Sequence, residues 1–196
     1  MTNRRQEILD KAKEMFSQRG FHAVSLEDIS RSLEMGKSTI YHYFPSKHEL
    51  WAEVLKDTVA GLYHYVLAKV NHQDPYHEQI RDLVSAILTY FEANRQSFLL
   101  LLRERLDFLD LETIKEQFDA RFRAEYDQFA EHFRSTVDAG KKAGVLADVD
   151  ASIILACIFG TINTVVLATV VHDPDRNLTE LVDDCYLVIM NGISAV

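Results

Sequence analysis

The chain contains 196 residues, of which 47% are apolar and only ten are Gly or Pro. This composition excludes disordered and collagen-like chains and leaves too few turn formers for a β-sandwich or barrel, so we predict an all-α protein of about nine helices. The net charge of −9 argues against nucleic-acid binding by the chain as a whole, but residues 1–50 carry eight basic and seven acidic side chains and differ from the acidic remainder.

A first helix is predicted near the N-terminus. Apolar residues recur at helical spacing from Ile8 to Phe16, and Gly20 stands where a C-terminal cap belongs. Arg4 and Arg5 begin this helix, where their side chains are available to bind phosphate. The first helix therefore carries cations that suit a nucleic-acid partner.

Two short helices are predicted next, over residues 26–33 and 37–44. Ser25-x-x-Asp28 resembles a capping box at the start of the first helix, and a three-residue link separates the two. Two short helices joined by a tight turn form a helix-turn-helix, whose second helix can enter the major groove of DNA.

The second of these helices has an unusual composition. Residues 37–44 contain two Tyr, one His, one Thr and one Ser but no acidic residue, and such groups hydrogen-bond to phosphates and base edges. The alternative is that the tyrosines and Phe44 form an ordinary aromatic core stripe. Ile40 and Phe44 are four residues apart and suit a core, but residues 41–43 cannot all face inward with them.

A long motif runs from Thr39 to Leu50 and reads Thr-Ile-Tyr-His-Tyr-Phe-Pro-Ser-Lys-His-Glu-Leu. It is preceded by Ile8-x-x-x-Ala12-x-x-x-Phe16-x-x-x-Gly20-Phe21 and by Ser25-x-x-Asp28-Ile29. With these motifs, residues 4–50 resemble the N-terminal domain of the tetracycline-repressor (TetR) family of bacterial transcription regulators. We accordingly predict a helix-turn-helix DNA-binding domain over residues 1–48 and an effector-binding and dimerisation domain over residues 49–196.

The resemblance also implies roles for individual residues in DNA binding. It implies that Thr39, Tyr43 and Lys47 bind phosphates, and that base edges or the backbone beside them are faced by Lys37, Ser38, Tyr41 and His42. The full predicted DNA-binding set is Arg4, Arg5, Ser25, Lys37, Ser38, Thr39, Tyr41, His42, Tyr43 and Lys47.

The turn of the helix-turn-helix departs from the family pattern. Glu34 stands where the family usually has Gly, Gly36 replaces the usual Ser, and Ser38 replaces a small Gly. Gly is nearly as good as Ser at an N-cap, so the helix start is retained. Glu34 predicts either a strained turn or a turn of different shape. DNA binding stays the prediction, while the operator sequence cannot be read from these residues.

Three further helices are predicted up to residue 102. Ser46-x-x-Glu49 is a capping box that opens a long helix, and Asp74-Pro75 supplies the N-cap and first position of a second, whose apolar face ends at Phe91. A short helix from about Ser97 contains five consecutive apolar residues, which indicates burial on several sides.

A long helix with an aromatic stripe is predicted from Asp110 to near Gly144. The resemblance implies a small-molecule pocket in this middle region, and aromatic side chains mixed with a few polar groups suit a small, largely apolar effector. Plain core packing is the alternative for each of these side chains. The predicted pocket residues are Tyr63, Phe91, Phe98, Phe118, Phe122, Tyr126 and Asn163.

Residues 151–171 form an uncharged stretch long enough to span a membrane. Acidic residues flank both ends, which favours a helix buried all round in a core or a subunit interface, and we predict no membrane partner. Small side chains recur every four residues from Ser152 to Ala168, which lets two helices approach closely.

The resembled family forms a four-helix dimer interface from the last two helices of each subunit. The final helix here is predicted to begin at Asn177-x-x-Glu180. We therefore predict a homodimer, and the alternative is that the small residues pack only within one subunit. The predicted interface residues are Ala156, Gly160, Thr164, Ala168, Leu181, Cys185 and Val188.

The two cysteines and the N-terminus give an expectation about location. Cys157 and Cys185 are 28 residues apart with no C-x-x-C motif, so we predict two free, buried thiols in a reducing compartment. No apolar stretch suited to a secretory signal follows residues 2–7. We expect a cytoplasmic protein.

No catalytic constellation is present in the sequence. None of the eight His has a Glu three residues before it, as a di-iron site needs, and the H-E-x-x-H, G-x-S-x-G, G-x-G-x-x-G and Walker motifs are absent. We predict no catalytic residue, no cofactor and no metal site.

Two functional hypotheses follow from these patterns. The first is a ligand-responsive repressor that binds a palindromic operator in double-stranded DNA as a homodimer. The second is an interaction protein whose N-terminal head has lost DNA binding and whose acidic body docks a protein partner.

Overall fold

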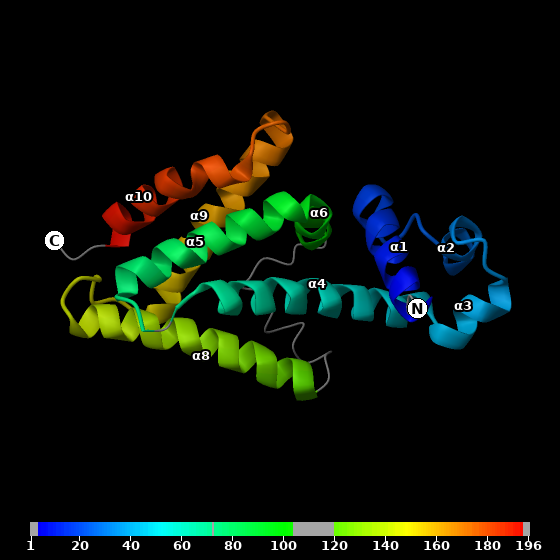
Figure 1. Ribbon diagram of the computed structural model, residues 1–196, viewed down its shortest axis with the longest axis horizontal. Helices are drawn as coiled ribbons and strands as arrows, with labels where there is room; N and C mark the ends of the chain where they lie inside the picture. The colour runs from blue at the N-terminus through cyan, green and yellow to red at the C-terminus, as the bar shows by residue number, and fades with distance from the viewer. Residues whose placement is uncertain (1–3, 72, 104–119, 194–196) are drawn as a thin grey trace. The chain divides into compact units, whose positions relative to one another are not determined.

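A computed structural model describes residues 4–71, 73–103 and 120–193 of the chain (Figure 1). Its described residues are almost all helical and contain no strand, which confirms the predicted all-α fold. The described elements are α1 (Arg4–Arg19), α2 (Leu26–Ser32), α3 (Lys37–Tyr43), α4 (Lys47–Lys69), α5 (Tyr76–Ala93), α6 (Arg95–Arg103), α8 (Ala120–Lys142), α9 (Ala151–His172), the 3₁₀ helix η1 (Leu178–Leu181) and α10 (Val182–Ile193).

The chain divides into two compact units. The described residues of the first are 4–60 and 94–103, and those of the second are 61–71, 73–93 and 120–193. The first unit therefore contains α1, α2, α3, the first part of α4, and α6. The second contains the last part of α4 together with α5, α8, α9, η1 and α10.

The core of the first unit is built on α1. Ile8, Ala12 and Phe16 are buried on one face of this helix, as their spacing predicts. The ring of Trp51, at the start of α4, meets the ring of Phe16 edge-on at a centroid distance of 5.0 Å. The helix α6 packs against α1, and its buried residues include Phe98. The helix α2 also packs against α1, so this core supports the helix-turn-helix.

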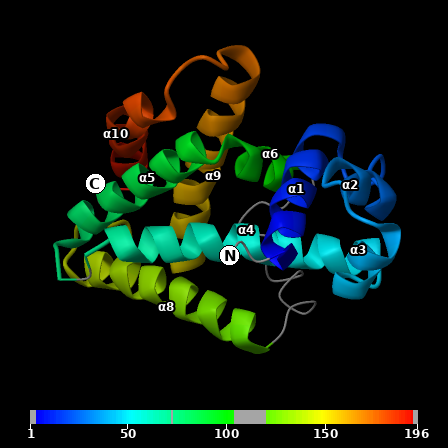
Figure 2. The ribbon, with the colours of Figure 1, turned by 45° about the vertical axis from the view of Figure 1, so that its right-hand side comes forward.

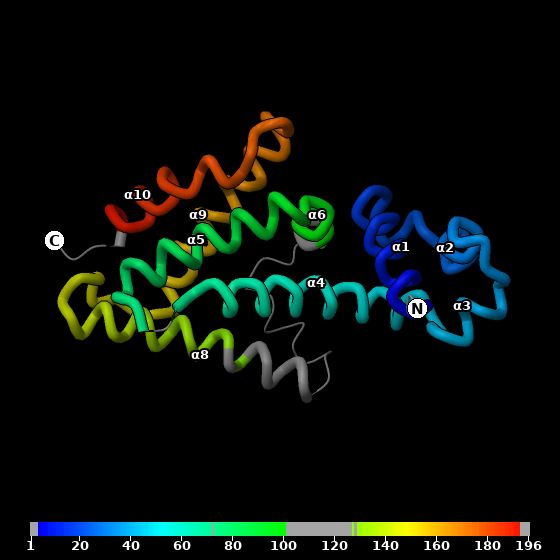
Figure 3. The backbone as a smooth tube through the Cα atoms, viewed as in Figure 1, coloured from blue at the N-terminus to red at the C-terminus, as the bar shows by residue number. Residues whose placement is uncertain are grey.

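The second unit is organised around α5. This helix packs against α8, α9, α10 and η1, and Figures 1 to 3 show α10 lying alongside it. Polar bonds fix the packing at two places. The Thr136 hydroxyl of α8 donates to the Gln79 side chain over 2.8 Å, and the Leu178 amide donates to the Glu92 carboxylate over 2.9 Å. Both Gln79 and Thr136 are buried, so this hydrogen bond satisfies groups that water cannot reach.

Three of the predicted helix ends agree with the structure. Gly20 ends α1 with a φ of 81°, and the Ser46 hydroxyl accepts the Glu49 amide at the start of α4 over 3.1 Å. Asp150 caps α9 by accepting the Ser152 amide over 2.8 Å. Such signals are local, which is why the sequence predicts them well.

Two predicted helix starts need comment. The Asn177 side chain accepts the amide of Thr179, while the amide of Glu180 donates to the Asn177 backbone carbonyl. A 3₁₀ turn therefore precedes the last α-helix, which begins at Val182. The predicted start at Asp110 lies outside the described residues, and α8 is described from Ala120 onward.

Candidate nucleic-acid interface

The helix-turn-helix is formed by α2 and α3 and the turn between them. The Ser25 hydroxyl accepts the Asp28 amide over 3.1 Å, and the Asp28 carboxylate accepts the Ser25 amide over 3.0 Å, so the predicted capping box is present. In the turn, Glu34 has a φ of 52°, in the left-handed region that favours glycine. The structure therefore shows the strained turn that the Gly-to-Glu departure predicts.

The two faces of α3 have different chemistry. Ile40 is fully buried and Phe44, at the C-cap, is 2% exposed, so these two side chains anchor the helix to the core. The side chains exposed to solvent are Lys37, Ser38, Thr39, Tyr41 and His42, and Tyr43 is half-buried. The alternative of an inward-facing aromatic stripe is thus wrong for Tyr41, while Phe44 is core as expected. An exposed helix face rich in hydroxyls and ring nitrogens is available to a partner.

Four cations belong to the predicted DNA-binding set, and each has an intramolecular partner. Arg4 pairs with Glu7 at 2.6 Å, and Arg5 pairs with Glu53 at 2.8 Å. Lys47 donates to the Phe21 carbonyl over 2.9 Å, and its ammonium lies 4.2 Å from the centre of the Phe21 ring. Lys37 pairs with Glu27 at 2.7 Å. The positive charge of this surface is therefore largely balanced within the protein.

The sequence interpretation did not include Glu27, which contacts two residues of the predicted DNA-binding set. The Lys37 ammonium lies 2.7 Å from Glu27 Oε1, and the Tyr41 hydroxyl donates to the same oxygen over 3.0 Å. The hydrogen bond from Lys37, helped by Tyr41, lowers the pKa of Glu27. The same carboxylate raises the pKa of Lys37 and of Tyr41 by bonding to their protonated forms. The signal available in the sequence was an acid in the first turn of α2 facing an acid-free α3.

The residues predicted to line an effector pocket have several different environments. Tyr63 is buried and stacks on Phe129 at a centroid distance of 4.2 Å, and Phe91 is also buried in the second unit. Phe98 is buried in the first unit, and Asn163 is half-buried on α9. Phe118 and the side chains of Phe122 and Tyr126 lie outside what the structure describes.

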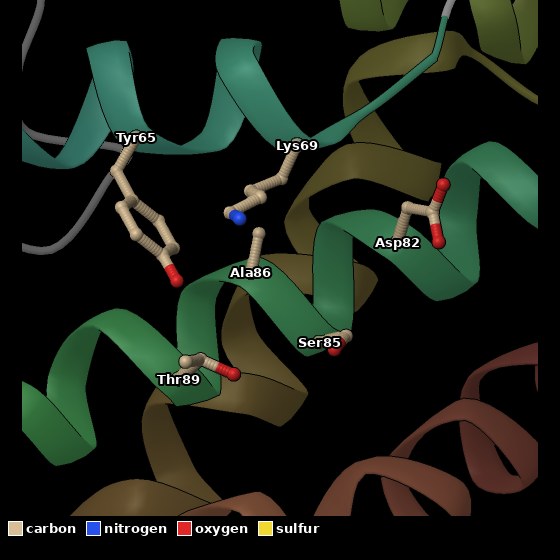
Figure 4. A pocket seen from close by; sticks show the side chains of 6 residues that line it. All are labelled: Tyr65, Lys69, Asp82, Ser85, Ala86 and Thr89. Atoms are coloured by element: carbon tan, nitrogen blue, oxygen red, sulfur yellow. The ribbon is translucent and has the colours of Figure 1, made fainter.

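A small groove lies between α4 and α5 within the second unit (Figure 4). Its volume is about 280 Å³, near the lower limit for small-molecule sites. None of the predicted pocket residues lines it. The lining residues are Tyr65, Lys69, Asp82, Ser85, Ala86 and Thr89. A polar groove of this kind does not match the apolar effector pocket that the sequence predicts.

One face of α9 is buried in its own unit and the other is exposed. Ile154, Ile158 and Ile162 pack inward, whereas Ile153 is 56% exposed and Val171 58% exposed. One protomer alone does not bury this helix on all sides, so its predicted burial in a subunit interface stays a prediction. By length and composition this helix is also the one candidate membrane span within the described residues.

The predicted dimer residues lie on α9, η1 and α10, and some are exposed while others are buried. Gly160, Thr164, Ala168 and Val188 are exposed, Ala156 is half-buried, and Leu181 and Cys185 are buried in the protomer's own core. Packing within one protomer thus leaves most of the small-residue stripe exposed. Leu187, which was not predicted, is 58% exposed beside Val188.

The cysteines also differ from expectation in one respect. Both are free thiols, but Cys157 is exposed and only Cys185 is buried. Burial raises the pKa of the Cys185 thiol, and the nearby Asp184 carboxylate adds to this effect. In the described ranges, no group of three or more His, Cys, Asp and Glu side chains is arranged to hold a metal ion.

Comparison with known proteins gives family models that cover both units. Residues 8–54 match the model of bacterial regulatory proteins of the tetR family, and residues 73–167 match a tetracyclin repressor-like C-terminal domain. The first match includes the whole helix-turn-helix, and the second includes α5, α6 and most of α9.

Two relatives illustrate the likeness. The chain is 30% identical over 98 residues to the transcriptional activator FasR of Mycolicibacterium smegmatis, covering 50% of this chain and 45% of the relative. It is 38% identical over 61 residues to the transcriptional repressor KstR2 of the same organism, covering 31% and 30%. These matches span less than half the length of either relative.

A solved structure shows the same fold over nearly the whole chain. The transcriptional regulator FadR of Bacillus subtilis, in complex with stearoyl-CoA, superposes with a TM-score of 0.71 at 17% identity, covering 96% of this chain and 98% of FadR. Such relatives are transcription regulators and not enzymes. With both family models, the helix-turn-helix and the all-α fold in agreement, the chain belongs to the TetR family of bacterial transcription regulators.

Proposed function

We propose that this protein is a cytoplasmic, ligand-responsive transcriptional regulator that binds double-stranded operator DNA as a homodimer. The observation that carries the proposal is the division of α3, with Ile40 and Phe44 buried and its polar side chains exposed. A short helix held by two apolar anchors presents its outer face in a fixed orientation, as major-groove recognition requires.

Homodimerisation through α9 and α10 would give the operator its symmetry. The exposed small-residue stripe of α9 and the exposed Val188 of α10 support the proposal that this surface is the dimer interface. A two-fold axis relates the two recognition helices, so the operator is expected to be a palindrome with half-sites about 34–36 Å apart, one turn of DNA.

The effector we propose is small and largely apolar, and it releases the protein from DNA. FadR of B. subtilis was solved with stearoyl-CoA, which carries a long apolar chain, and KstR2 of M. smegmatis is a repressor, whereas FasR is an activator. The buried aromatic residues Tyr63, Phe91 and Phe129 in the second unit support an apolar environment for such a ligand.

Sequence selection from random duplex DNA tests the central proposal. The purified protein is expected to enrich a palindrome with half-sites one helical turn apart. Addition of long-chain acyl-CoA is then expected to weaken binding to that palindrome. Tightened binding would instead favour an activator-like response, and no change would exclude long-chain acyl-CoA as the effector.

Single-residue variants assign the DNA contact to α3. Tyr43→Phe removes one hydroxyl from the predicted phosphate-binding set and is expected to weaken operator binding about fivefold, a loss of roughly 1 kcal/mol. Tyr65→Phe removes a hydroxyl from the second unit and serves as the matched control, with no expected change in DNA binding. Equal effects of the two substitutions would contradict the predicted contact between α3 and DNA.

The salt dependence of binding provides an independent test. Two subunits offer eight predicted cations, and release of counterions by all of them would give a slope of log K against log salt of about −7. We expect a smaller slope because three of the four cations in each subunit, Arg4, Arg5 and Lys37, are already paired with a carboxylate of the protein.

The same internal pairing favours the second candidate, an interaction protein without DNA binding. That candidate predicts that a folded, dimeric sample selects no DNA motif at low or moderate salt. It is therefore distinguished by the selection experiment itself.

A further inference from the structure

The Glu27 side chain links the two helices of the helix-turn-helix. It belongs to the first turn of α2, whereas its two hydrogen-bonding partners, Lys37 and Tyr41, lie one turn apart on α3. Both partners bond to the same oxygen, Oε1, at 2.7 Å and 3.0 Å. The Lys37 ammonium also lies 5.7 Å from the centre of the Tyr41 ring. The three side chains form one closed cluster, which we call the Glu27 cluster.

This cluster lies on the solvent side of the motif. The Lys37 side chain is 67% exposed, the Glu27 side chain is 36% exposed, and Tyr41 is 38% exposed. An ion pair this exposed contributes little to folding stability, because water and salt screen it. We expect the ion pair to affect instead the binding of a partner to this face of α3.

A carboxylate at this place changes how Lys37 can meet DNA. To bind a phosphate, Lys37 must leave Glu27 or bring the carboxylate close to the phosphate charges. Either event costs free energy on every DNA sequence. A base pair that supplies partners for both charges avoids this cost. A guanine–cytosine pair does so in the major groove, because guanine O6 and N7 accept from Lys while cytosine N4 donates to Glu.

Building on the proposed DNA-binding function, we propose that Glu27 is a specificity-determining residue that reads a guanine–cytosine base pair together with Lys37. Its carboxylate holds Lys37 and Tyr41 in place in the free protein and weakens binding to DNA that lacks that pair. It thereby raises the ratio of specific to non-specific binding.

The experiment compares the wild-type dimer with Glu27→Gln, Lys37→Met and the double variant. Each protein is titrated with the selected palindrome, with the palindromes that carry one altered base pair, and with a scrambled duplex, over a range of salt. In the wild type, replacing one guanine–cytosine pair in each half-site is expected to weaken binding at least tenfold. In Glu27→Gln this loss should shrink to about twofold, and affinity for the scrambled duplex should rise several-fold.

The control is Glu34→Gln. Glu34 is an exposed acid in the turn of the same motif, so this substitution makes the same change in net charge at a residue that is not part of the Glu27 cluster. A general electrostatic effect would make Glu34→Gln and Glu27→Gln alike and would overturn the proposal. Action through Lys37 requires that Glu27→Gln has no further effect on scrambled DNA in the Lys37→Met background.

The outcomes distinguish a failure of this proposal from a failure of the proposed DNA-binding function. If the wild type selects no motif, the DNA-binding function itself fails. If it selects a palindrome but Glu27→Gln keeps the same base preference at every position, only the role of Glu27 fails. Thermal melting of each variant checks the fold, and a melting temperature close to that of the wild type is expected because the cluster is exposed.

Discussion

Glu34 has a backbone conformation that its side chain does not favour. Its φ of 52° is in the left-handed region, where a residue with a Cβ atom costs about 1–2 kcal/mol more than glycine. The turn keeps this conformation because its neighbours fix it on both sides. The Glu34 amide donates to the Arg31 carbonyl over 3.1 Å, and the Met35 amide donates to the Ser30 carbonyl over 2.8 Å.

Glu34→Gly is expected to stabilise the protein. Relief of the left-handed strain exceeds the larger entropy that glycine gains on unfolding, so the free energy of unfolding should rise by about 0.5–1 kcal/mol. Urea denaturation measures this change. Glu34→Ala removes the carboxylate but keeps the Cβ atom. An equal rise in the free energy of unfolding of that variant would show that the effect comes from the charge and not from the backbone strain.

Single residues also show where sequence interpretation stops. The exposed and buried faces of α3 follow from helical periodicity, which is why Ile40 and Phe44 are predicted as core and found buried. The Glu27 cluster does not follow from periodicity, because Glu27 and Lys37 are ten residues apart on different helices. Their meeting depends on the geometry of the turn, which the departure at Glu34 left open.

The helix α2 is short and begins with a capping box. It has only seven residues, and its first turn is closed by the reciprocal bonds of Ser25 and Asp28. The Ser25 hydroxyl also donates to the Asp28 carboxylate over 2.6 Å. These bonds, led by the one from the hydroxyl, lower the pKa of Asp28. Ser25 was predicted as a DNA contact, and its hydroxyl serves as a cap in the structure.

Ser25→Ala is therefore expected to lower the free energy of unfolding by about 1 kcal/mol at neutral pH. Because the folded pKa of Asp28 is below its unfolded value, the stabilisation from its carboxylate is present above the unfolded pKa, near 3.9, and is lost on acidification. The difference between wild type and variant should thus become smaller as pH falls through about 4. Urea titrations at several pH values measure it, and a pH-independent difference would contradict the role of Asp28.

On the scale of the whole molecule, the helix composition is predictable and the grouping of helices is not. The compact first unit extends to residue 60 and includes α6, because α6 returns to pack against α1. This pairing joins segments about 80 residues apart in the chain and leaves no mark in the local sequence pattern. The predicted functional division at residues 48 and 49 remains a prediction.

The exposed apolar face of α9 and α10 leads to a prediction for assembly. Val188→Arg places a charge where the proposed dimer excludes water, and should weaken the dimer by about 30-fold or more, roughly 2 kcal/mol. Light scattering over a dilution series measures the change. Ala139→Arg, at an exposed position of α8, is the control that should leave the dimer intact. If both variants form dimers with the affinity of the wild type, the subunits associate through a surface other than the exposed face of α9 and α10.

The different environments of the two cysteines provide a native chemical reporter. A maleimide reacts with thiolate, so it should modify the exposed Cys157 readily and the buried Cys185, whose pKa is raised, slowly. Because Cys157 lies on α9 among the exposed residues of the proposed interface, its labelling rate should fall as protein concentration rises. The labelling rate of a native cysteine thus reports the association of subunits, and no engineered residue is needed.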